Sequence, residues 1–143
     1  SNTFENVQYD GVDLRGNRYT IKSEVADFKI ETPELINMKV MSAVFYFKDG
    51  TILRVKGNYG TYNNKTNDMS FKENIKVTYK GDDLCSDNLD FFNSKNYLKI
   101  YGKFRAESIK VYIKADNLEF GLLKQTLDIS MFSDEQINIV LTN

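Results

Sequence analysis

Apolar and polar residues alternate along most of this chain, as they do in β-strands with one buried face. Apolar side chains stand at every second position of 41–47, 75–79 and 127–131, mostly with polar residues between them. Turn-forming residues interrupt the alternation at 49–50, 63–68, 81–82 and 93–96, and Pro33 breaks the chain within 31–34. Period-two alternation bounded by such turns is typical of an antiparallel meander. The sequence therefore predicts strands throughout and no helix.

An eight-residue pattern occurs four times, at 21–28, 55–62, 84–91 and 113–120. Each copy begins with an aliphatic residue, continues through a small and then a polar residue, and ends in an aromatic residue. The aromatic residues stand at 28, 62, 91 and 120, so the period is 34, then 29, then 29. A recurring period of this size indicates a stack of similar supersecondary units.

The two ends of each copy are seven positions apart, so an unbroken strand would place them on opposite faces of the sheet. Both ends are nevertheless apolar. Between them lie a small residue (Ser23, Gly57, Ser86, Ala115) and a polar one (Glu24, Asn58, Asp87, Asp116). We infer a bulge or corner there, which resets the alternation so that both ends point inward. Four corners in register predict an elongated antiparallel β-jellyroll or sandwich with repeated bulged strands, open at its ends.

Length and composition indicate one all-β domain over residues 1–143. The 19 basic and 20 acidic residues give a net charge of −1, which argues against a general nucleic-acid binder. Histidine is absent and Cys85 is the single cysteine, so the sequence predicts neither a zinc site nor an intrachain disulfide. No cofactor is expected.

The repeat, together with the stretch before it, resembles the periplasmic domain of the LptC family. That stretch is Tyr9-Asp10-Gly11-Val12-Asp13-Leu14-Arg15-Gly16-Asn17-Arg18-Tyr19-Thr20-Ile21, and the most similar parts of the repeat are 23–28, 86–91 and 115–120. The resemblance covers nearly the whole chain. The OstA-like domain of LptA shares such repeats, and the Gly-Asn-x-Tyr lead-in favours LptC.

The resemblance implies a β-jellyroll in the periplasm, anchored to the inner membrane by an N-terminal helix. Such a domain takes lipopolysaccharide from an inner-membrane ABC transporter and passes it to an LptA-like protein, with the acyl chains in an apolar groove. Gly16 matches a family glycine associated with docking to the transporter side. The chain begins Ser1-Asn2-Thr3, which indicates that residues 1–2 are a tag remnant and that an upstream anchor has been removed. An LptA-like bridge protein is the nearest alternative.

The alternation and the repeat together predict an inward-facing set of apolar residues. On the sequence alone this set describes a filled sandwich core; the resemblance favours a groove that holds lipid. The set comprises Ala26, Phe28, Met41, Ala43, Phe45, Phe47, Tyr62, Ile75, Val77, Tyr79, Leu89, Phe91, Leu118, Phe120 and Ile129.

Polar features of the sequence have two interpretations each. The column formed by Glu24, Asn58, Asp87 and Asp116 offers oxygen ligands to calcium, but side chains that cap bulges and turns explain it better. The basic segment 95–114 offers cations to lipid phosphates or an acidic partner, although a solvated strand face explains it better.

The segment 137–141 is apolar and lies at a terminus, without Pro or Lys. As an edge strand it would be a template for another chain, and we expect Ile137, Ile139 and Leu141 to take part in partner docking. Carboxylate pairs such as Asp87 and Asp90 belong to the repeat, so a non-enzymatic protein is expected. The sequence thus favours a lipopolysaccharide-transfer domain, with a closed β-augmentation module that binds no lipid as the alternative.

Overall fold

The structure is a computed structural model that describes residues 2–14, 16–95, 97–106, 114–121, 126–130 and 136–140. Side chains are described within 2–14, 16–95 and 98–102. In these ranges the secondary structure is all β, which confirms the predicted fold class.

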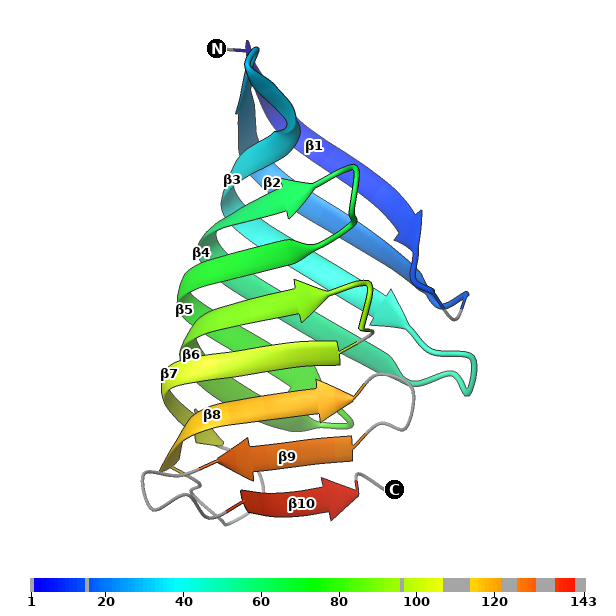
Figure 1. Cartoon of the computed structure of the whole chain (residues 1–143), viewed down its shortest axis with the longest axis vertical. Coiled ribbons are helices and arrows are strands. Elements are labelled where there is room, and N and C mark those ends of the chain that lie inside the picture. The colour runs from blue at the N-terminus through cyan, green and yellow to red at the C-terminus, as the bar shows by residue number, and fades with distance from the viewer. Residues whose placement is uncertain are drawn as a thin grey trace.

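One antiparallel sheet contains ten strands, arranged in space in the order of the sequence (Figure 1). The strands are β1 (Asn2–Val12), β2 (Arg18–Lys29), β3 (Thr32–Tyr46), β4 (Ile52–Asn63), β5 (Met69–Tyr79), β6 (Asp82–Phe92), β7 (Tyr97–Ala106), β8 (Lys114–Gly121), β9 (Thr126–Ser130) and β10 (Gln136–Val140). The predicted meander is therefore correct. The turn after β2 lies at Ile30 and Glu31, so Pro33 belongs to the start of β3 rather than to a break.

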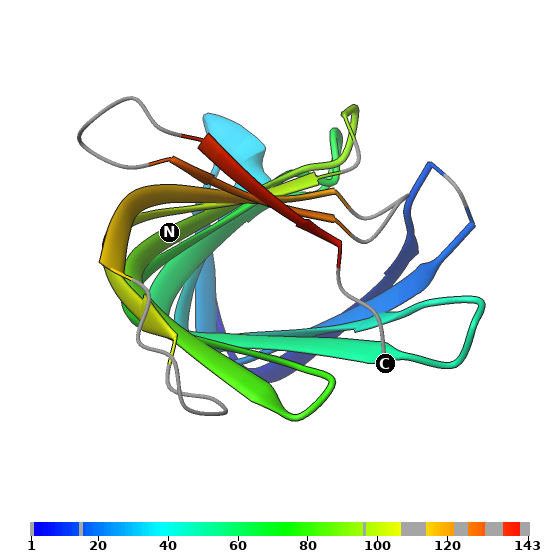
Figure 2. The same ribbon diagram turned by 90° about the horizontal axis from the view of Figure 1, so that it is seen from below.

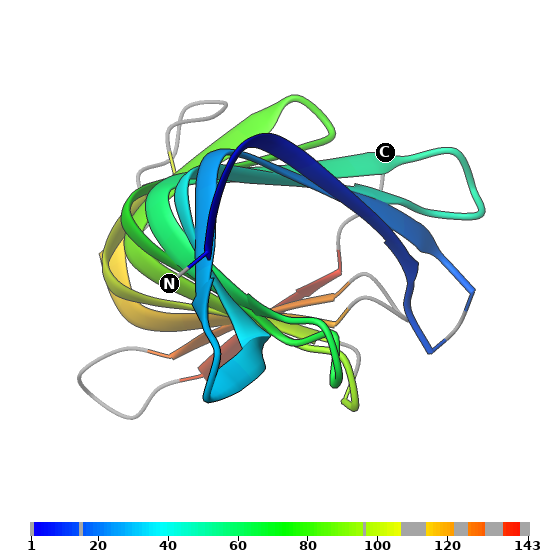
Figure 3. The same ribbon diagram turned by 90° about the horizontal axis from the view of Figure 1, so that it is seen from above.

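The sheet folds over on itself, so that end-on views show an arch around an interior (Figures 2 and 3). The expected two sheets are two halves of this one sheet. We call them the Tyr19 half and the Tyr62 half, after a residue of each. The Tyr19 half comprises 7–12, 18–23, 41–46, 52–57, 75–79 and 82–86; the Tyr62 half comprises 2–5, 25–29, 32–39, 59–63, 69–72, 88–92 and 97–101.

Burial along the strands confirms the predicted reset of the alternation. In β2 the buried positions run through Tyr19, Ile21 and Ser23, and the next buried position is Ala26. The odd positions thus face inward before the corner and the even positions after it. The same change occurs between Gly57 and Gly60 in β4, and β6 switches from even to odd inward positions between Ser86 and Leu89. Ser23, Gly57 and Ser86, the small residues of the three copies with described side chains, are buried at these corners.

The extra residues of the bulges lie in the strands beside the repeat, not within it. Opposite Gly57 and Asn58 of β4, β5 places three residues, 73–75. Opposite Ser86 and Asp87 of β6, β7 likewise places three residues, 102–104. Left-handed backbone occurs at these points, with φ of 70° at Glu73 and 91° at Gly102. The inference of a corner is correct, while the bulge itself belongs to β5 and β7.

Candidate functional site: the folded interior

Lines of register partners, here called rungs, run across the sheet along its long axis. One rung, which faces inward where its side chains are described, connects by register Phe4, Ala26, Met38, Gly60, Phe71, Leu89, Ile100, Leu118, Ile129 and Ile137. Its members with described side chains are apolar and, except at the end strand β1, largely buried. The apolar rung therefore extends by register from β1 to β10. Its continuity comes from the meander, which places each copy of the repeat two strands from the last.

Aromatic side chains from the two halves meet across the middle of the interior. The rings of Phe45 (Tyr19 half) and Phe91 (Tyr62 half) have centroids 5.1 Å apart. The centroid of the Tyr19 ring lies 6.2 Å from that of the same Phe91 ring. Exposure of these three side chains is at most 1%. Tilted and edge-on ring contacts at such distances are favourable. In this state the aromatic side chains themselves fill the middle of the interior.

Two tyrosine hydroxyls form a polar contact inside this apolar space. The Tyr19 and Tyr62 hydroxyl oxygens are 3.3 Å apart, and the Tyr62 hydroxyl donates to Oδ1 of Asn67 at 3.0 Å. Burial raises the pKa of Tyr19 well above its usual range, and the hydrogen bond to Tyr62 adds to this effect. The Tyr19–Tyr62 contact joins the two halves at a second point. Beside it, the rings of Tyr9 and Tyr62 have centroids 5.5 Å apart.

The interior is open at the β1 end. Phe4 and Phe28 stack there with centroids 6.0 Å apart and an interplanar angle of 12°. Of the strands that the structure describes, none lies beyond β1 in the sheet, and Phe4 is 51% exposed although its rung partners face inward. The apolar interior thus continues to a surface that water reaches.

Eleven of the fifteen predicted lining residues are buried in the interior. They are Ala26, Met41, Ala43, Phe45, Phe47, Tyr62, Ile75, Val77, Tyr79, Leu89 and Phe91. Phe28 is half-buried at the open end. Leu118, Phe120 and Ile129 take part in the registers of β7, β8 and β9 and are placed by backbone alone.

Several interior residues were missed by the sequence prediction. Tyr19, Phe71 and Leu98 are each at most 1% exposed. Tyr19 continues the alternation of β2 back from Ile21, the inward first residue of the repeat, so that pattern was available to find it. Leu98 carries no repeat signal, and the register with Phe91 is what places it.

Among the described residues, each end strand of the sheet has one unpaired edge, because β10 pairs with β9 alone and β1 pairs with β2 alone. The prediction of a C-terminal edge strand is correct for Ile137 and Ile139, while Leu141 lies outside the described residues. An unpaired edge is a template for another strand, and the sequence prediction did not identify the edge at β1.

Gly16 has a local structural role in the hairpin between β1 and β2. Its φ of 83° belongs to the left-handed region that favours glycine. Its N–H donates to the carbonyl of Asp13, and the Asp13 carboxylate accepts from the backbone N–H of Asn17 at 2.9 Å. The glycine is therefore needed by the turn itself; whether it also takes part in docking stays a prediction.

Glu24, Asn58 and Asp87 of the polar column lie on the outside of the corners, and the side chain of Asp116 lies outside the description. Glu24 and Asp87 are exposed, and Asn58 donates from Nδ2 to Oε1 of Glu73 in the bulge of β5 at 3.0 Å. A Cβ on Gly102 would lie 2.9 Å from Cβ of Asp87. Among the described side chains, no three potential ligands of His, Cys, Asp or Glu type converge. These contacts support the interpretation of the column as corner capping.

The basic segment 95–114 is described only in part. Lys99 lies with Nζ 5.5 Å from the Tyr101 ring centroid, and its rung partner in β6 is Asp90. The side chains of Lys103, Arg105 and Lys114 and the whole of Lys110 lie outside the description. Lys99 thus has an aromatic and an acidic neighbour and offers little support for a phosphate site.

No protein-family model matches this chain, and no curated protein sequence matches it significantly. Within the described ranges, no helix is long and apolar enough to cross a membrane.

Proposed function

We propose that this protein is a non-enzymatic lipid-transfer domain of the LptC type. It takes lipopolysaccharide from an inner-membrane ABC transporter at the periplasmic side and passes it to an LptA-like protein. The acyl chains travel along the folded interior, and the unpaired edges of β1 and β10 join the neighbouring proteins. The observation that carries the proposal is the apolar rung, which crosses all ten strands and ends at an exposed Phe4.

Burial of methylenes supplies the affinity in this mechanism. Each buried methylene contributes about 0.8 kcal/mol, so an acyl chain in the interior is held without any specific contact. The chain carries no phosphate-binding loop motif, so directional movement requires an energy-consuming partner. A lipid would have to part the contacts of Phe91 with Phe45 and Tyr19, because these rings occupy the space between the halves.

Photocrosslinking in cells that make lipopolysaccharide tests the proposal. A photoreactive residue replaces Phe45, which faces inward on β3, or Lys39, which faces outward on the same strand. We expect lipopolysaccharide adducts at Phe45 and none at Lys39. A folded protein that joins its partners but gives no adduct at Phe45 would exclude transport through the interior.

The second candidate is a structural module that joins other strands edge to edge and holds no lipid. The observation in its favour is the closed middle of the interior, where Phe45 and Phe91 are at most 1% exposed. It shares the edge-pairing of the first candidate, so deletion of β10 cannot distinguish them. The adduct at Phe45 can, because only the first candidate brings lipid to that side chain.

A further inference from the structure

The near-zero net charge of the chain conceals an uneven distribution on its surface. On the outer side of the Tyr19 half, one rung connects Gln8, Lys22, Ser42, Lys56, Lys76 and Cys85, and continues by register to Arg105 and Lys114. We call Arg18, Lys22, Arg54, Lys56 and Lys76 the basic face. All five point outward, and all but the half-buried Lys76 are exposed. This grouping draws its residues from three strands, β2, β4 and β5, and cannot be seen in a linear segment of sequence.

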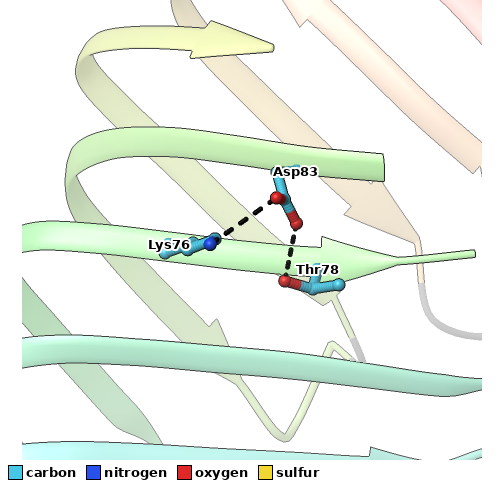
Figure 4. Close-up of polar contacts among 3 residues, drawn as sticks. All are labelled: Lys76, Thr78 and Asp83. Atoms are coloured by element: carbon cyan, nitrogen blue, oxygen red, sulfur yellow. Dashed lines mark hydrogen bonds and ion pairs between the residues drawn. The ribbon is translucent and has the colours of Figure 1, made fainter. Parts of the chain in front are cut away.

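Among the described strand positions of this outer surface two carboxylates, Asp10 and Asp83, lie beside the cations, and each is held by neighbours. Asp83 accepts from the Thr78 hydroxyl at 2.8 Å and lies 3.6 Å from Nζ of Lys76 (Figure 4). Asp10 accepts from the Thr20 hydroxyl at 2.8 Å. Two residues beyond Lys22 and Lys56 along their strands, Glu24 and Asn58 of the polar column lie at the corner and bound the face there. Cations therefore exceed acids on this surface before the corner.

An apolar rim adjoins the basic face. Val12, Arg18, Tyr46 and Ile52 form a single rung across β1 to β4, and the three apolar or aromatic members are 53%, 42% and 36% exposed. Leu14, at the tip of the first hairpin, is 63% exposed. We call Val12, Leu14, Tyr46 and Ile52 the apolar rim. The tips of the β1–β2 and β3–β4 hairpins project on the same side of the molecule (Figures 2 and 3).

A shallow depression of about 400 Å³ lies where the basic face meets the apolar rim. Its lining comprises Asp10, Gly11, Arg18, Tyr19, Thr20 and Tyr46. The Arg18 guanidinium offers paired donors of the kind that bind phosphate, and the Tyr46 ring is suited to the level of lipid headgroups. The volume is within the range of small-molecule sites.

We propose that this outer surface rests on an anionic phospholipid bilayer. The cations of the basic face lie at the headgroup phosphates, the apolar rim enters the interface, and Arg18 takes a phosphate in the depression. Cations beside exposed aliphatic and aromatic side chains are the combination that binds the surface of such membranes. The inference is independent of lipid in the interior.

Vesicle sedimentation with the full chain tests this inference. We expect binding to phosphatidylcholine vesicles that contain phosphatidylglycerol, weak binding to phosphatidylcholine alone, and a loss of binding as salt rises. Each cation near such a surface contributes about fivefold in affinity, so the double variant R54Q/K56Q should bind about 25-fold more weakly. The matched control is K39Q/K72Q, which removes two exposed cations from the outer side of the Tyr62 half and should bind as the wild type.

A second pair of variants tests the rim. Leu14→Ser should weaken vesicle binding, whereas Ile30→Ser, at a residue 75% exposed in the β2–β3 turn, should not. Equal losses in R54Q/K56Q and K39Q/K72Q would overturn the inference, as would wild-type binding that ignores phosphatidylglycerol. Binding to an acidic protein but not to vesicles would assign the face to that partner instead. Because no lipopolysaccharide is present, either result leaves the crosslink at Phe45 to decide the proposed function separately.

Discussion

Phe45 and Phe91 belong to opposite halves of the folded sheet, yet their rings lie 5.1 Å apart at the centre of the interior. Phe45 comes after the corner of β3 along the chain, and Phe91 comes after the corner of β6, which runs in the opposite direction. The same apolar alternation therefore supplies both walls of the interior. These two rings stabilise the core by filling the space that an acyl chain would need in order to pass through the interior.

Phe91→Ala should strongly destabilise the protein. Phe91 is fully buried and contacts Phe45 and Tyr19, so its truncation leaves a cavity between the halves. Losses of about 3–5 kcal/mol are usual for such changes. Urea denaturation measures the free energy of unfolding. Phe4→Ala, at a residue 51% exposed, is the control and should cost far less; comparable losses would mean that the middle of the interior is not packed as described.

Gly60→Ala should destabilise more than Gly57→Ala, although both glycines lie in the repeat of β4. A Cβ at Gly60 would collide with Sδ of Met41 and with the backbone carbonyl of Ser70. A Cβ at Gly57 would chiefly meet Cδ1 of Ile75, which is the end of a flexible side chain. Overpacking against backbone costs about 1–3 kcal/mol. Urea denaturation of both variants is the measurement, and the reverse order would contradict the corner geometry.

The strands and the corners could be predicted because both depend on alternation within one strand. The seven-residue separation of Ile21 and Phe28 conflicts with an unbroken strand, and a corner is the way to bury both ends. The position of the extra residue could not be predicted, because it lies in the neighbouring strand. Glu73 and Gly102 belong to no copy of the repeat, and their left-handed backbone follows from the pairing across the corner.

The candidate site was predictable as a set of inward residues but not as a shape. Alternation around Phe45 and the end of the repeat at Phe91 identify both as inward, and the structure confirms this. Their mutual contact depends on how far apart the halves stand, which no pattern along one strand specifies. The basic face escaped prediction for a similar reason, since Lys22 and Lys56 come together only through the register of β2, β3 and β4.

Stability should fall at alkaline pH, and Tyr19 should be responsible for part of the fall. Burial raises the pKa of Tyr19 in the folded protein, whereas in the unfolded chain the pKa is near its ordinary value of about 10. The stabilising contribution is therefore complete below about pH 10 and is lost above it, where the unfolded chain ionises and the folded protein does not.

Tyr19→Phe tests this assignment because it keeps the ring and removes the ionisable hydroxyl. At neutral pH it should cost about 1 kcal/mol through the lost hydrogen bond to Tyr62. Above about pH 10 its free energy of unfolding should fall less steeply than that of the wild type. Urea denaturation across this pH range gives both quantities. Tyr59→Phe, at a residue 47% exposed, is the control and should retain the wild-type slope; an unchanged slope in Tyr19→Phe would refute the assignment.

The open end of the interior should respond to lipopolysaccharide, and a tryptophan at Phe4 can report it. The chain contains no tryptophan, so Phe4→Trp gives one tryptophan, which can be excited selectively over the tyrosines, next to Phe28 at that end. The proposed function predicts that added lipopolysaccharide excludes water there and shifts the emission to shorter wavelength. Tyr59→Trp, on the outer side of the Tyr62 half, is the control and should not shift. An equal emission shift in Phe4→Trp and Tyr59→Trp would indicate that the lipid adsorbs to the outside of the protein. If lipid binds but neither emission shifts, the β1 end is excluded as the opening.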